Sequence, residues 1–463
     1  MESPNPLFIA CFLCLLIFLY ILRSSLAEKD RSKIIVSTEF KTFQRSYLLV
    51  FLIMMGADWL QGPYVYELYR TQYAYSETEI GQLFVVGFGT SMLFGGFVGS
   101  AADKYGRKKL CIVYALLYSG CCWTKHSPDF HVLMFGRFLG GISTSILFSA
   151  FESWMIHEHH SKSFPNEWLS ETFATATTLN GFVAIFAGVL GGLLVDNFGL
   201  VAPFDASWMF LFMGGGAILM LWGENYGDQQ APILATLKEA GNRMFHDPRI
   251  LLIGCIQSLF ESAMYIFVFK WTPALGDVPH GWVFASFMTA VMLGSTIFSY
   301  LVRTGHKIER FLIGVFVMAS VSLLVPVFVS PTKLEPGVED DAITSLNTKV
   351  TWLRFASFLV FEACVGVFWP SICTMRGSYV PEEVRATLMN FFRIPLNIIV
   401  VFVLYQKRAE QETFWICTGL LCLAACFQFW LKNITVDSAG KLGEEGSKEA
   451  PVDEESEETP LVN

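Results

Sequence analysis

Runs of about 20 apolar residues recur along the whole chain and constrain its fold more than any other feature. A helix needs about that length to cross a hydrocarbon core of about 30 Å. Hydrophobic residues make up 53% of the 463 residues and charged residues only 16%, whereas soluble chains carry about 25% charged residues. Inside a bilayer, segments of this length satisfy their backbone hydrogen bonds as helices. The chain is therefore expected to be an all-α polytopic membrane protein.

The apolar runs predict one early membrane span and twelve further ones. The early span covers residues 5–22, and a basic segment follows it up to Arg45. Bases that follow an apolar run, rather than precede it, favour an uncleaved span with its N-terminus outside. The further spans are expected at residues 47–68, 80–100, 110–125, 129–151, 172–195, 206–223, 250–272, 281–302, 311–330, 351–375, 385–405 and 412–431.

The longest loop between these twelve spans, residues 224–249, divides them into six plus six. We expect an N-terminal half over 47–223 and a C-terminal half over 250–431, preceded by the extra span and basic segment at 1–46. Residues 432–463 form an acidic tail that is expected to be disordered. Most Lys and Arg fall in the loops that this arrangement places inside, so the C-terminus is expected in the cytosol.

The two halves resemble each other in sequence around two acidic residues. Asp58 is the twelfth residue of the first span in the N-terminal half, and Glu261 is the twelfth of the first span in the C-terminal half. Each precedes an aromatic-rich stretch. Duplicated halves place a substrate site at their interface near the middle of the membrane.

Charged side chains occupy the middle of several spans. Asp58, Arg137, Glu261 and Glu362 lie near mid-depth, and Arg393 is the other deep cation. A charge at this depth costs about 2.5–3.5 kcal/mol on insertion scales, which favours a functional role. Arg137 could pair with Asp58 or bind an anionic substrate with both arms of its guanidinium. The acidic residues are candidates for proton coupling, whereas Glu261 and Glu362 without Arg393 nearby would be protonated structural groups.

Several classes of function find no support in the sequence. The stretch His157–Ser161 reads HEHHS, so serine stands where the zinc motif HExxH needs its second histidine. The cysteines show no metal-ligand spacing with histidine, and the phosphate-binding motif GxxxxGK[ST] is absent from the sequence. We therefore expect no metal, no cofactor, no enzymatic activity and no nucleic-acid partner.

A turn rich in glycine and charge joins the second and third bundle spans, at residues 99–110 with the sequence GSAADKYGRKKL. It is similar to the signature Gly-x-x-x-Asp-Arg/Lys-x-Gly-Arg-Lys, which joins helices two and three in the major facilitator superfamily. The stretch RFLGG at residues 137–141 resembles the fourth-helix motif of that superfamily. The resemblance implies two pseudo-symmetric six-helix halves plus one extra N-terminal transmembrane helix.

The same resemblance implies a cytoplasmic gate at this turn. Its residues would be Gly99, Asp103, Gly106 and Arg107. We expect Asp103 to cap the helix that starts near residues 382–387, because the N-terminus of a helix favours an anion.

More specifically, the chain resembles the molybdate-anion transporter family. The similar blocks lie at residues 57–69, 136–143, 148–159, 222–226, 256–273 and 390–397. The resemblance implies secondary import of molybdate, a tetrahedral oxyanion, across a plasma membrane by alternating access, with proton coupling as a hypothesis. The residues alone leave open another small solute, such as sulfate, an organic anion or a sugar. They also leave open a receptor or scaffold that kept a transporter fold.

Overall fold

The computed structural model describes residues 6–27, 37–227, 233–331, 341–380, 382–406 and 408–448, and regular secondary structure within these ranges is helical throughout. Eleven of the described helical stretches are long and apolar enough to cross a membrane, and residues 391–405 add a shorter apolar helix. Every one of the twelve expected bundle spans coincides with a helix in the described ranges. The predicted all-α polytopic membrane fold is confirmed.

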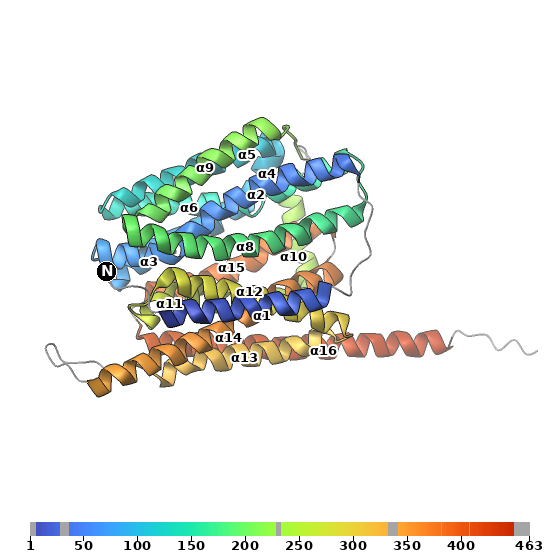
Figure 1. Ribbon diagram of the computed structural model, residues 1–463. Coiled ribbons are helices and arrows are strands. Elements are labelled where there is room, and N and C mark those ends of the chain that lie inside the picture. The colour runs from blue at the N-terminus through green and yellow to red at the C-terminus, as the bar shows by residue number, and fades with distance from the viewer. Residues whose placement is uncertain are drawn as a thin grey trace, which may run out of the picture.

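Figure 1 shows the helices as two bodies stacked one above the other, with the N-terminal half in blue to green and the C-terminal half in yellow to red. The N-terminal half comprises α2 (Thr38–Gln61), α3 (Val65–Glu67), α4 (Glu77–Tyr105), α5 (Arg107–Trp123), α6 (Phe130–Leu147), α7 (Ala150–Ser161), α8 (Asn166–Phe198) and α9 (Ala202–Leu221). The C-terminal half comprises α11 (Pro248–Leu275), α12 (His280–Arg303), α13 (Ile308–Phe328), α14 (Asp341–Tyr379), α15 (Glu382–Tyr405) and α16 (Glu410–Lys448).

Local sequence signals set where helices begin and turn. Ser76 and Glu79 form a reciprocal capping box at the start of α4, which satisfies backbone N–H groups that have no partner inside the helix. Asp129 caps α6 in a similar way, by accepting hydrogen bonds from the backbone N–H groups of its first residues. Gly106 alone separates α4 from α5, with a φ of 111°. This backbone conformation favours glycine, so the tight turn between the two helices requires glycine at position 106.

The two halves meet mainly where α4 packs against α15 and where α8 packs against α12. We name the two ends of the bundle after residues on α4, the Glu77 end and the Asp103 end. Side-chain ties between the halves gather at the Glu77 end, where Lys270 of α11 forms an ion pair with Glu77. A second pair joins His280 Nδ1 of α12 to Glu67 Oε2 of α3 at 2.8 Å. These ties hold the halves together at the Glu77 end.

The extra helix α1 (Pro6–Ala27) packs along α12 and also reaches α8. Its Phe8 ring stacks on Trp352 of α14 with 4.4 Å between the ring centroids. The guanidinium of Arg23 lies 5.7 Å from the ring centroid of Phe182 on α8, and its Nε donates to Thr296 on α12 at 3.4 Å. The helix α1 therefore covers one side of the seam between the halves.

The segment between the halves carries a helix that we did not predict, α10 (Ile233–His246), which packs on α11 and α15. The last helix also differs from expectation. It continues from its apolar span to Lys448, so residues 432–448, which we expected to be disordered, are helical. A helix that is already formed grows one residue at a time without a new nucleation cost, which lets it run on into polar sequence. The rest of the expected tail, 449–463, lies outside the described residues.

Candidate functional site

A cavity of about 90 Å³ lies between the halves, enclosed by α4, α5 and α6 on one side and by α11 and α15 on the other. That volume exceeds what a single water molecule needs. Its polar side chains are Ser91, Tyr118, Arg137, Thr144, Tyr265, Arg393 and Asn397. The structure thus brings together the two deep arginines that the sequence singled out, one from each half. An interface between duplicated halves is where transporters of this type place their substrate.

Arg137 is held by α4 while it faces the cavity. Its Nε donates to the backbone oxygen of Leu83 at 3.3 Å, and its guanidinium lies 4.7 Å from the ring centroid of Phe84. The close approach of α6 to α4 depends on Gly141, where an added Cβ would stand 2.5 Å from the backbone oxygen of Gly87. Glycine at position 141 therefore lets α6 approach α4 closely. In the described residues Nε makes the one hydrogen bond of this side chain, so the terminal nitrogens are available to an anion.

Asp58 contacts a tyrosine rather than Arg137. Tyr118 Oη on α5 donates to Asp58 Oδ1 at 2.6 Å, and no ion pair joins Asp58 to Arg137 among the described residues. Tyr118 also lines the cavity, so the carboxylate is connected to the cavity through one phenol. Sequence reasoning missed Tyr118, because the sequence does not distinguish a tyrosine that only packs in an apolar span from one that donates to a carboxylate.

Glu261 lies behind the cavity wall in the C-terminal half and is 3% exposed. Its Oε1 accepts a hydrogen bond from Gln257 Nε2 at 2.7 Å. The amide oxygen of Gln257 in turn accepts from Arg376 Nη1 at 2.9 Å. Arg393 lies close enough to act on this carboxylate electrostatically. The structure therefore supplies the cationic neighbour that the sequence analysis required for a role of Glu261 beyond packing.

Glu362 is also buried, at 6% exposure on α14. It is not among the side chains that line the cavity. Among the described residues, no charged side chain interacts electrostatically with the Glu362 carboxyl group, so burial is the one influence on it. The structure does not bring Glu362 together with Asp58, Arg137, Glu261 and Arg393.

The turn at the Asp103 end is tied within the N-terminal half. Asp103 Oδ1 accepts hydrogen bonds from Arg107 at 2.7 Å from Nη2 and 3.0 Å from Nε. The carboxylate of Glu224, which follows α9, accepts from the backbone N–H of Lys108 at 2.9 Å and of Lys109 at 3.2 Å. Glu224 thus caps α5, and an anion is favoured at that helix N-terminus. Sequence reasoning assigned no role to Glu224, because the residues it caps precede it by more than a hundred positions.

Of the two expected gate glycines, only Gly106 has a role that the structure explains, and one expected contact of Asp103 is not described. Gly106 provides the turn, and an added Cβ there would stand 2.6 Å from the carboxyl carbon of Glu224. Gly99 lies on α4 with nothing within 4 Å of an added Cβ. The expected cap by Asp103 falls at residues 382–387, whose side chains lie outside the described ones.

Comparison with known proteins agrees with this architecture. A family model described as sugar transporters with 12 transmembrane segments matches residues 7–355. A molybdate-anion transporter of Takifugu rubripes is 35% identical over 405 residues, which cover 81% of this chain and 81% of the relative. One from Xenopus tropicalis is 34% identical, with 84% of this chain and 86% of the relative covered. The crystal structure of a nucleoside transporter variant matches with a TM-score of 0.65 at 12% identity, over 84% of this chain and 99% of that chain.

The stacked halves with a cavity between them, together with relatives that are named transporters and not enzymes, identify the chain as a secondary membrane transporter. The chain belongs to the molybdate-anion transporter family of the major facilitator superfamily.

Proposed function

We propose that this protein carries molybdate across a membrane by alternating access, with the central cavity as its binding site. The observation that carries the proposal is the pair Arg137 and Arg393, which come from opposite halves and line one cavity. A guanidinium presents a planar fork of donors that suits an oxyanion. An oxyanion held by both arginines would join the halves at mid-depth, so its arrival and departure would be coupled to their rocking.

An anion fits this cavity better than a neutral sugar, although the matching family model is described by sugars. Arg137 and Arg393 are the charged side chains that line the cavity in the described residues, and no carboxylate lines it with them. A neutral solute would bring no counter-charge to these two cations, and the nearest carboxylate to Arg393, that of Glu261, lies behind the cavity wall. Charge at mid-membrane depth is costly without compensation. A tetrahedral dianion compensates both.

We propose proton coupling through the acidic residues behind the cavity wall. Asp58 reaches the cavity through the hydroxyl of Tyr118, and Glu261 lies beside Arg393. A proton on either carboxyl would change the net charge next to the anion. Such a change provides a physical link between proton movement and anion release. Glu362, which lies away from the cavity, is the least favoured of the three carboxyls for this role.

The orientation, the membrane and the gate are also part of the proposal. We place the N-terminus outside and the C-terminus in the cytosol of a plasma-membrane protein, as the bases in the inner loops indicate. The halves at 47–223 and 250–431 would rock as units, joined by residues 224–249. The Asp103 end is then cytoplasmic, and Gly99, Gly106 and the Asp103–Arg107 pair form part of its gate.

Uptake of radiolabelled molybdate into proteoliposomes tests the proposal. Wild-type protein should take up molybdate, tungstate and sulfate should compete, and sugars should not. Arg137→Gln and Arg393→Gln should each abolish uptake with unchanged protein yield. Arg310→Gln, which removes the same charge from an exposed position at the start of α13, is the matched control. Wild-type uptake rates in Arg137→Gln, or competition by sugars alone, would refute the assignment.

A further inference from the structure

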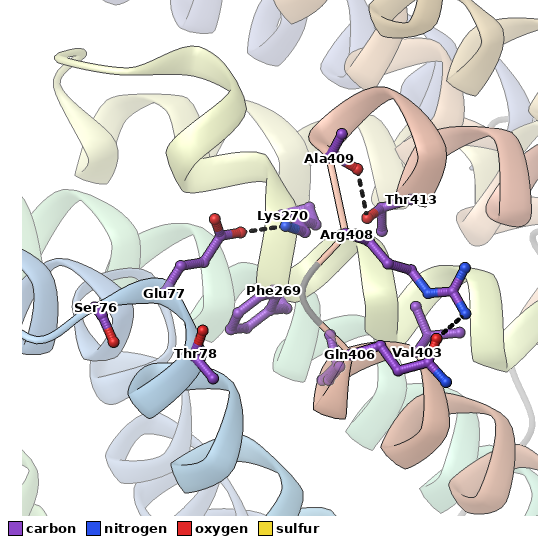
Figure 2. Close-up of a pocket in the computed structure, with 11 residues that line it drawn as sticks. Ser76, Glu77, Thr78, Phe269, Lys270, Val403, Gln406, Arg408, Ala409 and Thr413 are labelled. Atoms are coloured by element: carbon purple, nitrogen blue, oxygen red, sulfur yellow. Dashed lines mark hydrogen bonds and ion pairs between the residues drawn. The ribbon is translucent and has the colours of Figure 1, made fainter.

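A second and larger cavity, of about 370 Å³, opens at the Glu77 end. Figure 2 shows it between the start of α4, the end of α11 and the turn from α15 to α16. Its polar walls come from Ser76, Glu77 and Thr78 in the N-terminal half and from Lys270, Gln406, Arg408 and Thr413 in the C-terminal half. This cavity shares no lining residue with the central one.

The ion pair between Lys270 and Glu77 forms one wall of this cavity (Figure 2). Lys270 is only 6% exposed, so its ammonium depends on Glu77 for a counter-charge. The Glu77 side chain is half exposed, at 50%. Because the two residues belong to different halves, this pair is both a wall of the cavity and a tie that keeps the Glu77 end closed.

Two donors in the cavity wall have no partner. Thr78 Oγ1 and Arg408 Nε are buried and lack a hydrogen-bond partner among the described residues. Buried polar atoms are almost always paired, so these two donors leave unused hydrogen-bonding capacity in one wall of the cavity. Together with the positive charges of Lys270 and Arg408, they favour an anion over a cation or an apolar molecule.

We propose that this cavity is a second anion site, which takes a tetrahedral oxyanion before it reaches the central cavity. The inference rests on the proposed function, because it makes the same oxyanion the ligand of both sites. An anion beside Lys270 competes with Glu77 for the ammonium and repels its carboxylate. Binding therefore weakens the Glu77–Lys270 tie between the halves. The arrival of substrate at this site loosens the end of the bundle through which it enters.

Protection of an introduced cysteine from labelling tests the site in the full chain in nanodiscs. Ala409 is exposed in the turn before α16 and lines the cavity, so Ala409→Cys adds a reporter with little change in volume. A bulky maleimide should label it, above the labelling of the parent chain with its native cysteines. Sodium molybdate should slow the labelling, and sodium chloride at equal ionic strength should not.

Two further substitutions, each combined with Ala409→Cys, distinguish binding at this site from binding at the central cavity. In Arg137→Gln, which disables the central cavity, molybdate should still protect the reporter. In Arg408→Gln, half-protection should need about tenfold more molybdate, the loss expected for about 1.4 kcal/mol. Arg70→Gln is the matched control, because Arg70 is exposed at the same end of the bundle and does not line the cavity. It should leave protection unchanged.

The outcomes distinguish failure of this site from failure of the proposed function. Equal protection by chloride, no protection at all, or equal sensitivity of Arg408→Gln and Arg70→Gln would overturn the second site. Protection that disappears in Arg137→Gln would show that the reporter senses the central cavity instead. Protection without molybdate uptake by wild-type protein would leave this site standing and refute the proposed transport. Equilibrium binding of radiolabelled molybdate to Arg137→Gln, with and without Arg408→Gln, gives the same answer without the reporter.

Discussion

Arg137 and Gly87 face each other so closely that the guanidinium occupies the space a side chain at position 87 would need. A Cβ built on Gly87 would stand 2.8 Å from Nη2 of Arg137 and 3.2 Å from its Cζ and Nε. Both residues line the central cavity. The position of the cationic head of Arg137 is therefore set by the absence of a side chain on the neighbouring helix.

Gly87→Ala should impair transport by displacing this guanidinium. Overpacking of this kind costs about 1–3 kcal/mol, so uptake should fall about fivefold or more, since about 1.4 kcal/mol corresponds to a factor of ten. Gly89→Ala on the same helix is the matched control, because nothing lies within 4 Å of a Cβ there. The measurement is molybdate kcat/KM in proteoliposomes, normalised to monodisperse protein. Equal activities of the two variants would show that the position of Arg137 is not limiting.

Tyr118→Phe tests the connection between Asp58 and the cavity. The variant removes the hydroxyl that donates to Asp58 at 2.6 Å, and a hydrogen bond to a charged group contributes about 1.5–3 kcal/mol. We expect molybdate uptake to fall about tenfold or more. Tyr114→Phe, one helical turn earlier on α5, removes only a long hydrogen bond of 3.4 Å to Met54 and should transport normally. If both variants behave like wild type, the phenol of Tyr118 has a packing role only.

Glu77→Gln should shift the protein toward a state that is open at the Glu77 end. The substitution leaves the buried Lys270 without its counter-charge. The closed state should lose about 1–3 kcal/mol of free energy, a value between those for breaking an exposed and a buried ion pair. Spin labels on the exposed residues Gln72 and Glu412, one in each half, would report a longer distance. The control Glu79→Gln keeps a capping side chain on the same turn, and an equal shift in that variant would contradict the gate.

The fold and part of the site could be predicted because their signals are local. An apolar run of the right length identifies a span, and an arginine in its middle is conspicuous because the bilayer penalises it. Arg137 and Arg393 stand out in this way, and the structure places both on one cavity. Depth alone does not give the face of a helix, however. Glu261 and Glu362 are predicted at similar depth, yet Arg393 of the cavity wall acts on Glu261 and not on Glu362.

The remaining site residues depend on contacts between distant parts of the chain. Glu224 caps α5 although it lies 116 positions from Lys108 in the sequence. Lys270 pairs with Glu77, which is 193 positions away. Tyr118 matters because it both lines the cavity and donates to Asp58, a combination that only the folded chain reveals. Each of these roles arises from tertiary packing, for which spacing along a single sequence carries no signal.

The packing of α1 against both halves gives a final prediction. Leu19 of α1 is 2% exposed and lies in one apolar cluster with Ile185 of α8 and Met292 of α12. Lipid tails are as apolar as leucine, so the stability lost in Leu19→Ala reflects lost packing rather than exposure to water. It should therefore lie at or below the low end of the about 2–5 kcal/mol seen in soluble cores. The melting temperature of the purified protein should fall in Leu19→Ala and stay unchanged in Leu13→Ala, whose side chain is 48% exposed on the same helix. Equal melting temperatures would mean that α1 lies beside the bundle without stabilising it.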